Sequence, residues 1–256
     1  MPSILLINPN TSTLTLDMML TVARPLLPTG VALQGAVAAA GAAMILDEAA
    51  LAAAEEEVVR IGTAAARDVD VIVVAAFGDP GVRRLRNLLG IPVVGIGEAA
   101  IREAAAGGWR FGIATTTPRL VRSISAGVCR LGLQGCYTGA RVPDCDPLEL
   151  AADPAKQDLA LAQAALDCMT LDGAGAVIIG GGPLSETAAR LRCRSNIPIV
   201  EPIPSAMRAA LNWLRFQKRA GGNTFQVGQR TQSALAVVKG LPWSDTETSA
   251  NLHNVR

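Results

Sequence analysis

Four short turns stand out in this sequence because each follows an apolar run and is rich in small polar residues or glycine. INPNTS at 7–12 and ATTTPR at 114–119 carry amides and hydroxyls where a helix is expected to begin. FGDPG at 77–81 and GGGP at 180–183 carry glycines after two other runs. The N–H groups and positive dipole end of a helix start suit a carboxylate or imide oxygen, and glycines let a ligand approach the backbone. The four turns together predict a site for a small acidic molecule.

The predicted binding residues are the polar side chains of the first two turns and residues of the other two. They are Asn8, Asn10, Thr11, Ser12, Phe77, Gly78, Thr115, Thr116, Thr117, Gly181, Gly182 and Pro183. Asparagine, serine and threonine also cap helices, so capping alone is the alternative for each polar turn. The pairing of two such turns favours ligand binding.

Acid–base chemistry in such a site requires a titratable group, and the sequence offers few. Asp79 is the carboxylate of the third turn, and Glu201 follows the apolar run at 198–200. Burial in a dry cleft raises the pKa of a carboxylate into a useful range, so we expect Asp79 and Glu201 to be catalytic. The alternative for Asp79 is an ordinary turn residue before proline. The one histidine, His253, lies in a polar tail, so neither a metal site nor a histidine triad is expected.

Apolar runs and helical patterns alternate along most of the chain. Alanine-rich segments such as 46–68 and 99–108 have the composition of helices. Strands are predicted at 3–8, 31–37, 69–76, 92–96, 110–116, 175–181 and 198–203. This alternation predicts an α/β fold in which mainly parallel strands are covered by helices on both faces.

An internal repeat divides the chain into two halves. LLINPNTSTL from Leu5 matches GIATTTPRLV from Gly112, at an offset of 107 residues. GIPVVGIGEAAIREAA from Gly90 matches NIPIVEPIPSAMRAAL from Asn196 at an offset of 106, and VIVVAAFGDPG matches AVIIGGGPLSE at nearly the same shift. Three matches in one order predict two similar α/β lobes related by a pseudo-twofold axis, with the site in the cleft between them.

The boundaries of the lobes follow from the same repeat. We expect residues 1–97 and 205–220 to form the first lobe and residues 98–204 the second. The α/β rhythm is lost after about residue 216, and residues 221–256 are expected to be a C-terminal tail.

Composition excludes several classes of protein. The chain has 256 residues, half of them apolar, and a formal net charge of +1, which argues against nucleic acid as the main partner. No apolar run approaches the roughly 18 residues of a membrane helix, and the first residues lack the features of a secretory signal. The five cysteines form no CxxC pair, so a reduced, cytoplasmic setting is expected.

Neither of two common cofactor-binding motifs is present in full. VVGIGEAA at 93–100 fits a GxGxxA pattern after a strand, but it does not follow the first strand of its lobe, and no acidic residue ends the next strand. A phosphate-binding GxxxxGK[ST] loop is absent from the sequence. We therefore expect no cofactor.

The sequence resembles the aspartate/glutamate/hydantoin racemase superfamily, and within it the hydantoin and allantoin racemase branch. The resemblance rests on INPNTS, AAFGDPG, GIPVVGIGEAA, RFGIATTTPR, VIIGGGPLSE and IPIVEPI, and it covers about residues 3–215. It implies the two-lobed fold, homo-oligomers, and a pair of cysteines that remove and return a proton on opposite faces of a carbon. Those cysteines fall on Ala76 and Gly181 here, so this chain lacks both of them.

The missing thiols decide which functions stay open. Without cysteines at positions 76 and 181, this chain cannot racemise a substrate by the thiol mechanism. The loss is large, because each positioned general acid or base contributes about 10²–10⁴ in rate. We expect a racemase-like isomerase that acts on a small carboxylate or cyclic ureide by a non-cysteine mechanism. The alternatives are a decarboxylase, lyase or hydrolase on the same fold, a non-catalytic binder of small anionic metabolites, or an inactivated racemase.

Overall fold

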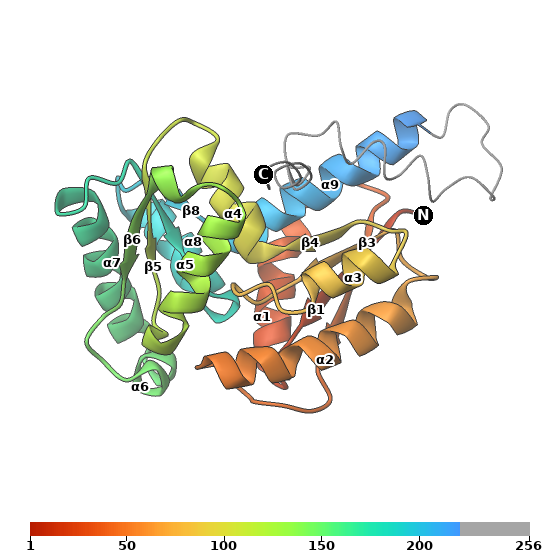
Figure 1. The fold of residues 1–256 in the computed structure, drawn as a ribbon, viewed down its shortest axis with the longest axis horizontal. Coiled ribbons are helices and arrows are strands. Elements are labelled where there is room, and N and C mark those ends of the chain that lie inside the picture. The colour runs from red at the N-terminus through yellow and green to blue at the C-terminus, as the bar shows by residue number, and fades with distance from the viewer. Residues whose placement is uncertain (221–256) are drawn as a thin grey trace, which may run out of the picture.

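The structure is a computed structural model that describes residues 1–220, so the predicted tail at 221–256 and His253 lie outside the described residues. Two four-stranded parallel sheets, each flanked by helices, lie beside one another (Figure 1). Strand order is β2-β1-β3-β4 in the first sheet and β6-β5-β7-β8 in the second, which is the same topology. The predicted α/β fold with two similar lobes is confirmed.

The elements alternate as the sequence predicts. The first half contains β1 (Ser3–Asn8), α1 (Thr13–Ala23), β2 (Ala32–Val37), α2 (Glu48–Ala65), β3 (Val71–Val74), α3 (Val82–Leu88), β4 (Val93–Gly95) and α4 (Ile96–Ala105). The second half contains β5 (Phe111–Ala114), α5 (Val121–Arg130), β6 (Tyr137–Arg141), α6 (Pro147–Ala152), α7 (Pro154–Thr170), β7 (Ala176–Ile179), α8 (Ser185–Arg194), β8 (Ile199–Val200) and α9 (Pro202–Ala220). Short 3₁₀ helices lie at Arg24–Leu26, Pro118–Leu120, Gln134–Cys136 and Gly182–Leu184.

The first strand shows why its sequence is apolar at successive positions. Ile4 and Leu6 pack with α1 and α9 on one face of the sheet, while Leu5 and Ile7 pack with α2 and α3 on the other. Successive side chains of a strand point to opposite faces, so a strand covered on both sides needs a continuous apolar run. The same two-sided burial holds for β7 in the second lobe.

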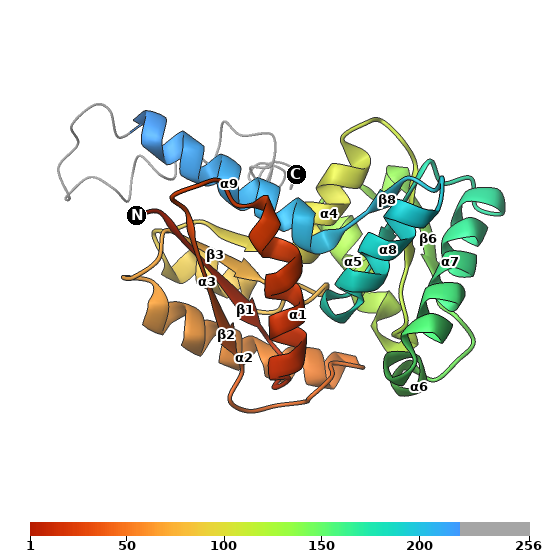
Figure 2. The same ribbon diagram turned by 180° about the vertical axis from the view of Figure 1, so that it is seen from behind.

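The last helix joins the two halves of the molecule. α9 follows β8 of the second sheet and returns across the first, where Ile203, Met207 and Leu211 enter the core beside β1 and β3. α4 packs against α9 and also contacts β7 and β8 (Figure 2). No helix within residues 1–220 combines the length and the hydropathy needed to cross a membrane.

Candidate functional site

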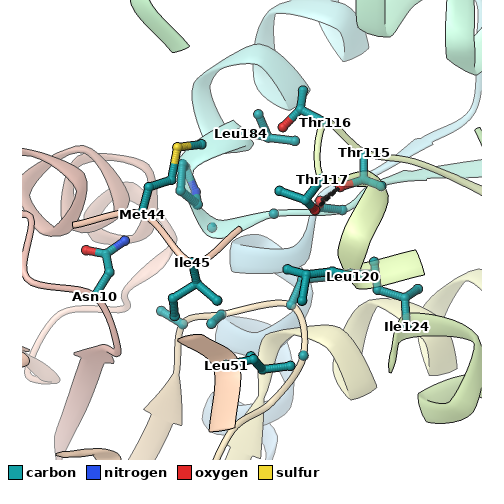
Figure 3. A pocket seen from close by; sticks show the side chains of 18 of the residues that line it. Asn10, Met44, Ile45, Leu51, Thr115, Thr116, Thr117, Leu120, Ile124 and Leu184 are labelled. Atoms are coloured by element: carbon teal, nitrogen blue, oxygen red, sulfur yellow. Dashed lines mark hydrogen bonds between the residues drawn. The ribbon is translucent and has the colours of Figure 1, made fainter. Parts of the chain in front are cut away.

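The two sheets present the carboxyl ends of their central strands to a shared cavity. β1 and β3 end in the same way as β5 and β7: the N–H of Ala75 donates to the carbonyl of Ile7, and that of Gly180 to the carbonyl of Ala114, both at 2.8 Å. The cavity beyond these ends has a volume of about 60 Å³. It is lined by residues of all four turns and by the segments next to them (Figure 3).

In the first lobe, the turn after β1 holds two buried asparagines in a fixed arrangement. Asn8 Nδ2 donates to Asn10 Oδ1 at 2.6 Å and to the carbonyl of Ser12 at 2.9 Å. The N–H of Ser12 also donates to Asn10 Oδ1. These bonds occupy the oxygen of Asn10 and leave its Nδ2 as a donor for a ligand.

Capping explains part of that turn. The Ser12 hydroxyl accepts from the N–H of Thr15 at 3.1 Å and caps α1. Neither Ser12 nor Thr11 lines the cavity, whereas Asn8 and Asn10 do.

In the second lobe, the threonines take the equivalent places. The hydroxyl of Thr115, which is almost fully buried, donates to the carbonyl of Gly180 at 2.7 Å. Its oxygen lies 3.2 Å from that of Thr117, as Asn8 contacts Asn10 in the first lobe (Figure 3). Thr117 precedes the 3₁₀ helix at 118–120 but makes no capping bond with its side chain, so capping does not account for it.

The two glycine-containing turns form the floor of the cavity. Ala76, Phe77 and Gly78 come from the first lobe, and Gly180 to Pro183 come from the second. In the described part of the chain, neither the N–H of Ala76 nor that of Gly181 donates to another backbone group. These two positions, where the resemblance places cysteines, therefore both lie at the cavity.

Apart from Ser123, the rest of the lining is an apolar wall that sequence reasoning missed. Met44, Ile45 and Leu51 come from the loop before α2 and from α2 itself. Leu120 and Ile124 come from the second lobe and lie near Ile45 and Leu51, below the threonines in the view of Figure 3. Leu51 and Ile124 have the helical spacing of core residues, so their spacing alone does not mark them as site residues. Met44 and Ile45 lie in a loop that carries no such pattern.

Asp79 does not line the cavity. Its carboxylate accepts from the N–H groups of Gly97 at 2.9 Å and Glu98 at 2.6 Å, at the start of α4. Burial raises the pKa of Asp79 to about 7, against the effect of the two N–H groups, which lower it. The pKa lies in the range predicted for a catalytic carboxylate, but the side chain is directed to a helix end.

Glu201 is also outside the cavity lining. It is 9% exposed, lies between β8 and α9, and forms an ion pair with Arg192 of α8. Its carbonyl accepts from the N–H and the hydroxyl of Ser205 in the first turn of α9. The structure thus brings together ten of the twelve predicted binding residues and places both predicted catalytic carboxylates elsewhere.

None of the residues in 1–220 that line the cavity is ionisable. Cys168 is buried in the second lobe, and burial raises the pKa of its thiol to about 11, which makes it a poor nucleophile or base. The other four cysteines also lie outside the lining. Residues 1–220 contain no group of three or more histidine, cysteine or acidic side chains arranged to hold a metal ion.

Two parallel α/β lobes that meet around a cavity at their strand ends define the pseudo-symmetric racemase class of fold. A family model described as Asp/Glu/Hydantoin racemase matches residues 4–210, and this chain belongs to that family.

Relatives and solved structures agree with this assignment. Hydantoin racemase from Paenarthrobacter aurescens is 27% identical over 209 residues, which are 81% of this chain and 89% of that enzyme. Hydantoin racemase from Rhizobium meliloti is 31% identical over 145 residues, 57% of this chain but only 60% of that enzyme. The structure of allantoin racemase from Klebsiella pneumoniae superposes with a TM-score of 0.77 at 25% identity, covering 90% of this chain and 92% of the other.

Proposed function

We propose that this chain is a racemase-family isomerase that acts on a small cyclic ureide or carboxylate with an apolar substituent, without a thiol. One observation supports this most. The cavity combines donors from both lobes with an apolar wall, and none of its lining residues within 1–220 carries an ionisable side chain.

The lining favours a ligand of one particular polarity. Asn10 and Thr117 stand on opposite sides of the cavity and suit the oxygens of a small planar group (Figure 3). A dicarboxylate would bury two charges without a cationic partner, which costs several kcal/mol. A neutral ring or a monoanion is therefore favoured.

The chemistry that this lining permits is stabilisation of an enolate. Water or hydroxide removes the proton next to a carbonyl, and the electron pair moves onto the carbonyl oxygen. The N–H of Gly181 then stabilises that oxygen, together with either Asn10 Nδ2 or the Thr117 hydroxyl, which must turn its proton from Thr115 Oγ1 to the ligand. Each such donor contributes about 10²–10³ in rate. Water returns the proton to either face, which inverts half of the molecules at each turnover. Without two positioned acid–base groups, turnover is expected to be slow.

The test is proton exchange on an enantiopure substrate. With (S)-5-benzylhydantoin in D₂O, we expect the chain to accelerate both loss of the C5 proton in NMR spectra and loss of optical rotation. The rate should rise with hydroxide concentration and show no bell-shaped pH profile, because no protein group is titrated in the step. Exchange that is no faster than in buffer, together with no change in melting temperature, contradicts the proposal.

A matched pair of variants separates the site from general stability. Thr117→Val removes a hydroxyl at the cavity, and we expect it to slow exchange about tenfold or more. Thr170→Val removes an exposed hydroxyl on α7 that bonds to its own helix, and should leave exchange unchanged. A ligand that raises the melting temperature but is recovered without exchange would instead support a non-catalytic binding protein.

Decarboxylation is the second candidate, because its first step needs no protein base. In the monoanion of a malonate-type acid, the bond to the one ionised carboxylate breaks, CO₂ leaves, and the electron pair stays as an enolate that water protonates. The apolar wall of Ile45, Leu51, Leu120 and Ile124 would disfavour the charged carboxylate before it leaves. Release of CO₂ from phenylmalonate in the presence of the chain distinguishes this reaction from isomerisation.

A further inference from the structure

Asp79 has an unusual backbone conformation at the edge of the cavity floor. Its φ of 52° makes it the one non-glycine residue with positive φ among residues 1–220. Such a conformation is uncommon outside glycine and is retained where the surrounding structure fixes it. Here it directs the carboxylate to Gly97 and Glu98 at the start of α4.

The start of α4 is built to receive this carboxylate. Gly95 occupies the cap position of the helix and has no side chain with which to bond the free N–H groups. Asp79 supplies that bond from eighteen residues earlier in the chain. A Cβ on Gly95 would overlap the Asp79 carboxylate, and one on Gly97 would overlap the carbonyl of Phe77. The two glycines of the GIG sequence are therefore needed for this close approach.

The backbone of Asp79 is also linked to the residues that line the cavity. Ala76, Phe77 and Gly78 line the cavity and directly precede Asp79, whose N–H donates to the carbonyl of Ala76 at 2.9 Å. α4 in turn packs on α9 and on the strands β7 and β8 of the second lobe. The floor of the cavity is thus fastened through one carboxylate to a helix that contacts both lobes.

We infer that Asp79 is a positioning residue, which holds the backbone of Ala76 to Gly78 in the shape that the ligand requires. It acts through α4 and does not touch the ligand. This inference rests on the proposed function, because it concerns how the same cavity binds its ligand. A cap that served stability alone would leave ligand affinity unchanged once each variant is compared in its folded state.

Variants at position 79 separate the cap from the backbone conformation. Asp79→Gly accommodates positive φ but removes the cap, whereas Asp79→Asn accommodates it and keeps one acceptor oxygen. We expect affinity for 5-benzylhydantoin to fall roughly tenfold in Asp79→Asn and further in Asp79→Gly, measured by calorimetry where circular dichroism shows both to be folded. Gly97→Ala should weaken binding to a similar extent, because the added methyl group on α4 would push the backbone of Phe77 out of place.

The control is Asp158→Asn, which breaks a two-bond pair with Arg190 between α7 and α8, away from the cavity. It should lose stability but keep wild-type affinity. Wild-type affinity in both Asp79 variants would overturn the inference.

A measurement without ligand keeps the two proposals distinct. We expect hydrogen exchange at the amide of residue 79, which donates to the carbonyl of Ala76, to accelerate at least tenfold in Asp79→Asn relative to its intrinsic rate and to stay unchanged in Asp158→Asn. If the wild-type chain binds no hydantoin, the proposed function fails, and this exchange result alone decides the role of Asp79. Equal exchange in Asp79→Asn and wild type would overturn the inference.

Discussion

The carbonyl oxygen of Ala75 in the first lobe lies against the backbone of Gly182 in the second. A Cβ on Gly182 would come to 2.5 Å from that oxygen and to 2.9 Å from the sulfur of Met19. On the other side of the same floor, the ring of Phe77 lies against Gly180. The two turns therefore interlock at the cavity, and the closeness of the lobes depends on the absence of a side chain at 182.

Gly182→Ala tests this contact. The added methyl group must push the lobes apart or displace the turn, and overpacking of this kind costs about 1–3 kcal/mol of unfolding free energy. Urea denaturation followed by circular dichroism measures the loss. Gly90→Ala is the matched control, because nothing lies within 4 Å of its Cβ position, and its stability should stay near that of the wild type. Equal stability of the two variants would contradict the interlocked floor.

Much of this site could be predicted from sequence because strand ends and repeats are local signals. The matches that place Asn8 opposite Thr115 and Ala76 opposite Gly181 follow from the order and offset of three segments. Parallel strands in one sheet end at the same edge, so residues after each strand gather there without any knowledge of side-chain packing. In the structure, the two asparagines, the three threonines and residues of both glycine turns line one cavity.

The positions of the two carboxylates could not be predicted from the neighbouring sequence. Asp79 directly follows lining residues, but its positive φ directs its side chain to the start of α4. The one sequence feature that indicates such a partner is Gly95, which stands at the cap position of α4 and has no side chain to cap it. Glu201 follows a strand, but an arginine nine residues earlier in the chain forms an ion pair with it. The apolar wall, including Leu51 and Ile124, was missed because core and cavity share the same helical spacing.

Thr115 offers a second test, of the scaffold under the threonine corner. Its buried hydroxyl donates to the carbonyl of Gly180 and joins the ends of β5 and β7. Thr115→Val keeps the shape but leaves that carbonyl without the bond, at a cost of about 1–3 kcal/mol in unfolding free energy. Thr170→Val, at an exposed position, should change stability by less than about 0.5 kcal/mol. Equal losses of unfolding free energy in Thr115→Val and Thr170→Val would show that the buried hydrogen bond does not stabilise the fold more than an exposed one.

The stability of the chain should depend on the protonation of Asp79. Burial raises the pKa of Asp79 to about 7 in the folded chain from an ordinary value of 3.8, and nearby Glu98 also raises it while Arg86 lowers it. Between these two pH values the folded state holds a proton that the unfolded state has released. The free energy of unfolding therefore falls as pH rises from about 4 to 7, by a few kcal/mol in total.

Asp79→Asn removes this titration, so the comparison isolates one group. We expect the difference in unfolding free energy between wild type and Asp79→Asn to favour the wild type more at pH 5 than at pH 8. Denaturation curves at several pH values measure it, and contributions from other carboxylates cancel in the difference. A difference that stays constant across this range would mean that Asp79 is ionised in the folded chain throughout.

Thiols placed at the two cavity positions provide the strongest test of the site. Gly181 has extended backbone, and a side chain there meets only the flexible Leu184, so cysteine fits without backbone strain. We expect Ala76→Cys or Gly181→Cys alone to speed deuterium incorporation into 5-benzylhydantoin with configuration retained.

The double variant should speed exchange and racemisation together, by about 10²–10⁴ over the wild type, because removal and return of the proton then occur on opposite faces. Chiral chromatography and NMR separate the two outcomes. The matched double serine variant has nearly the same volume but no group that ionises near neutral pH, and should gain nothing. If the double cysteine variant gains no more than the serine control, positions 76 and 181 do not flank the reacting carbon.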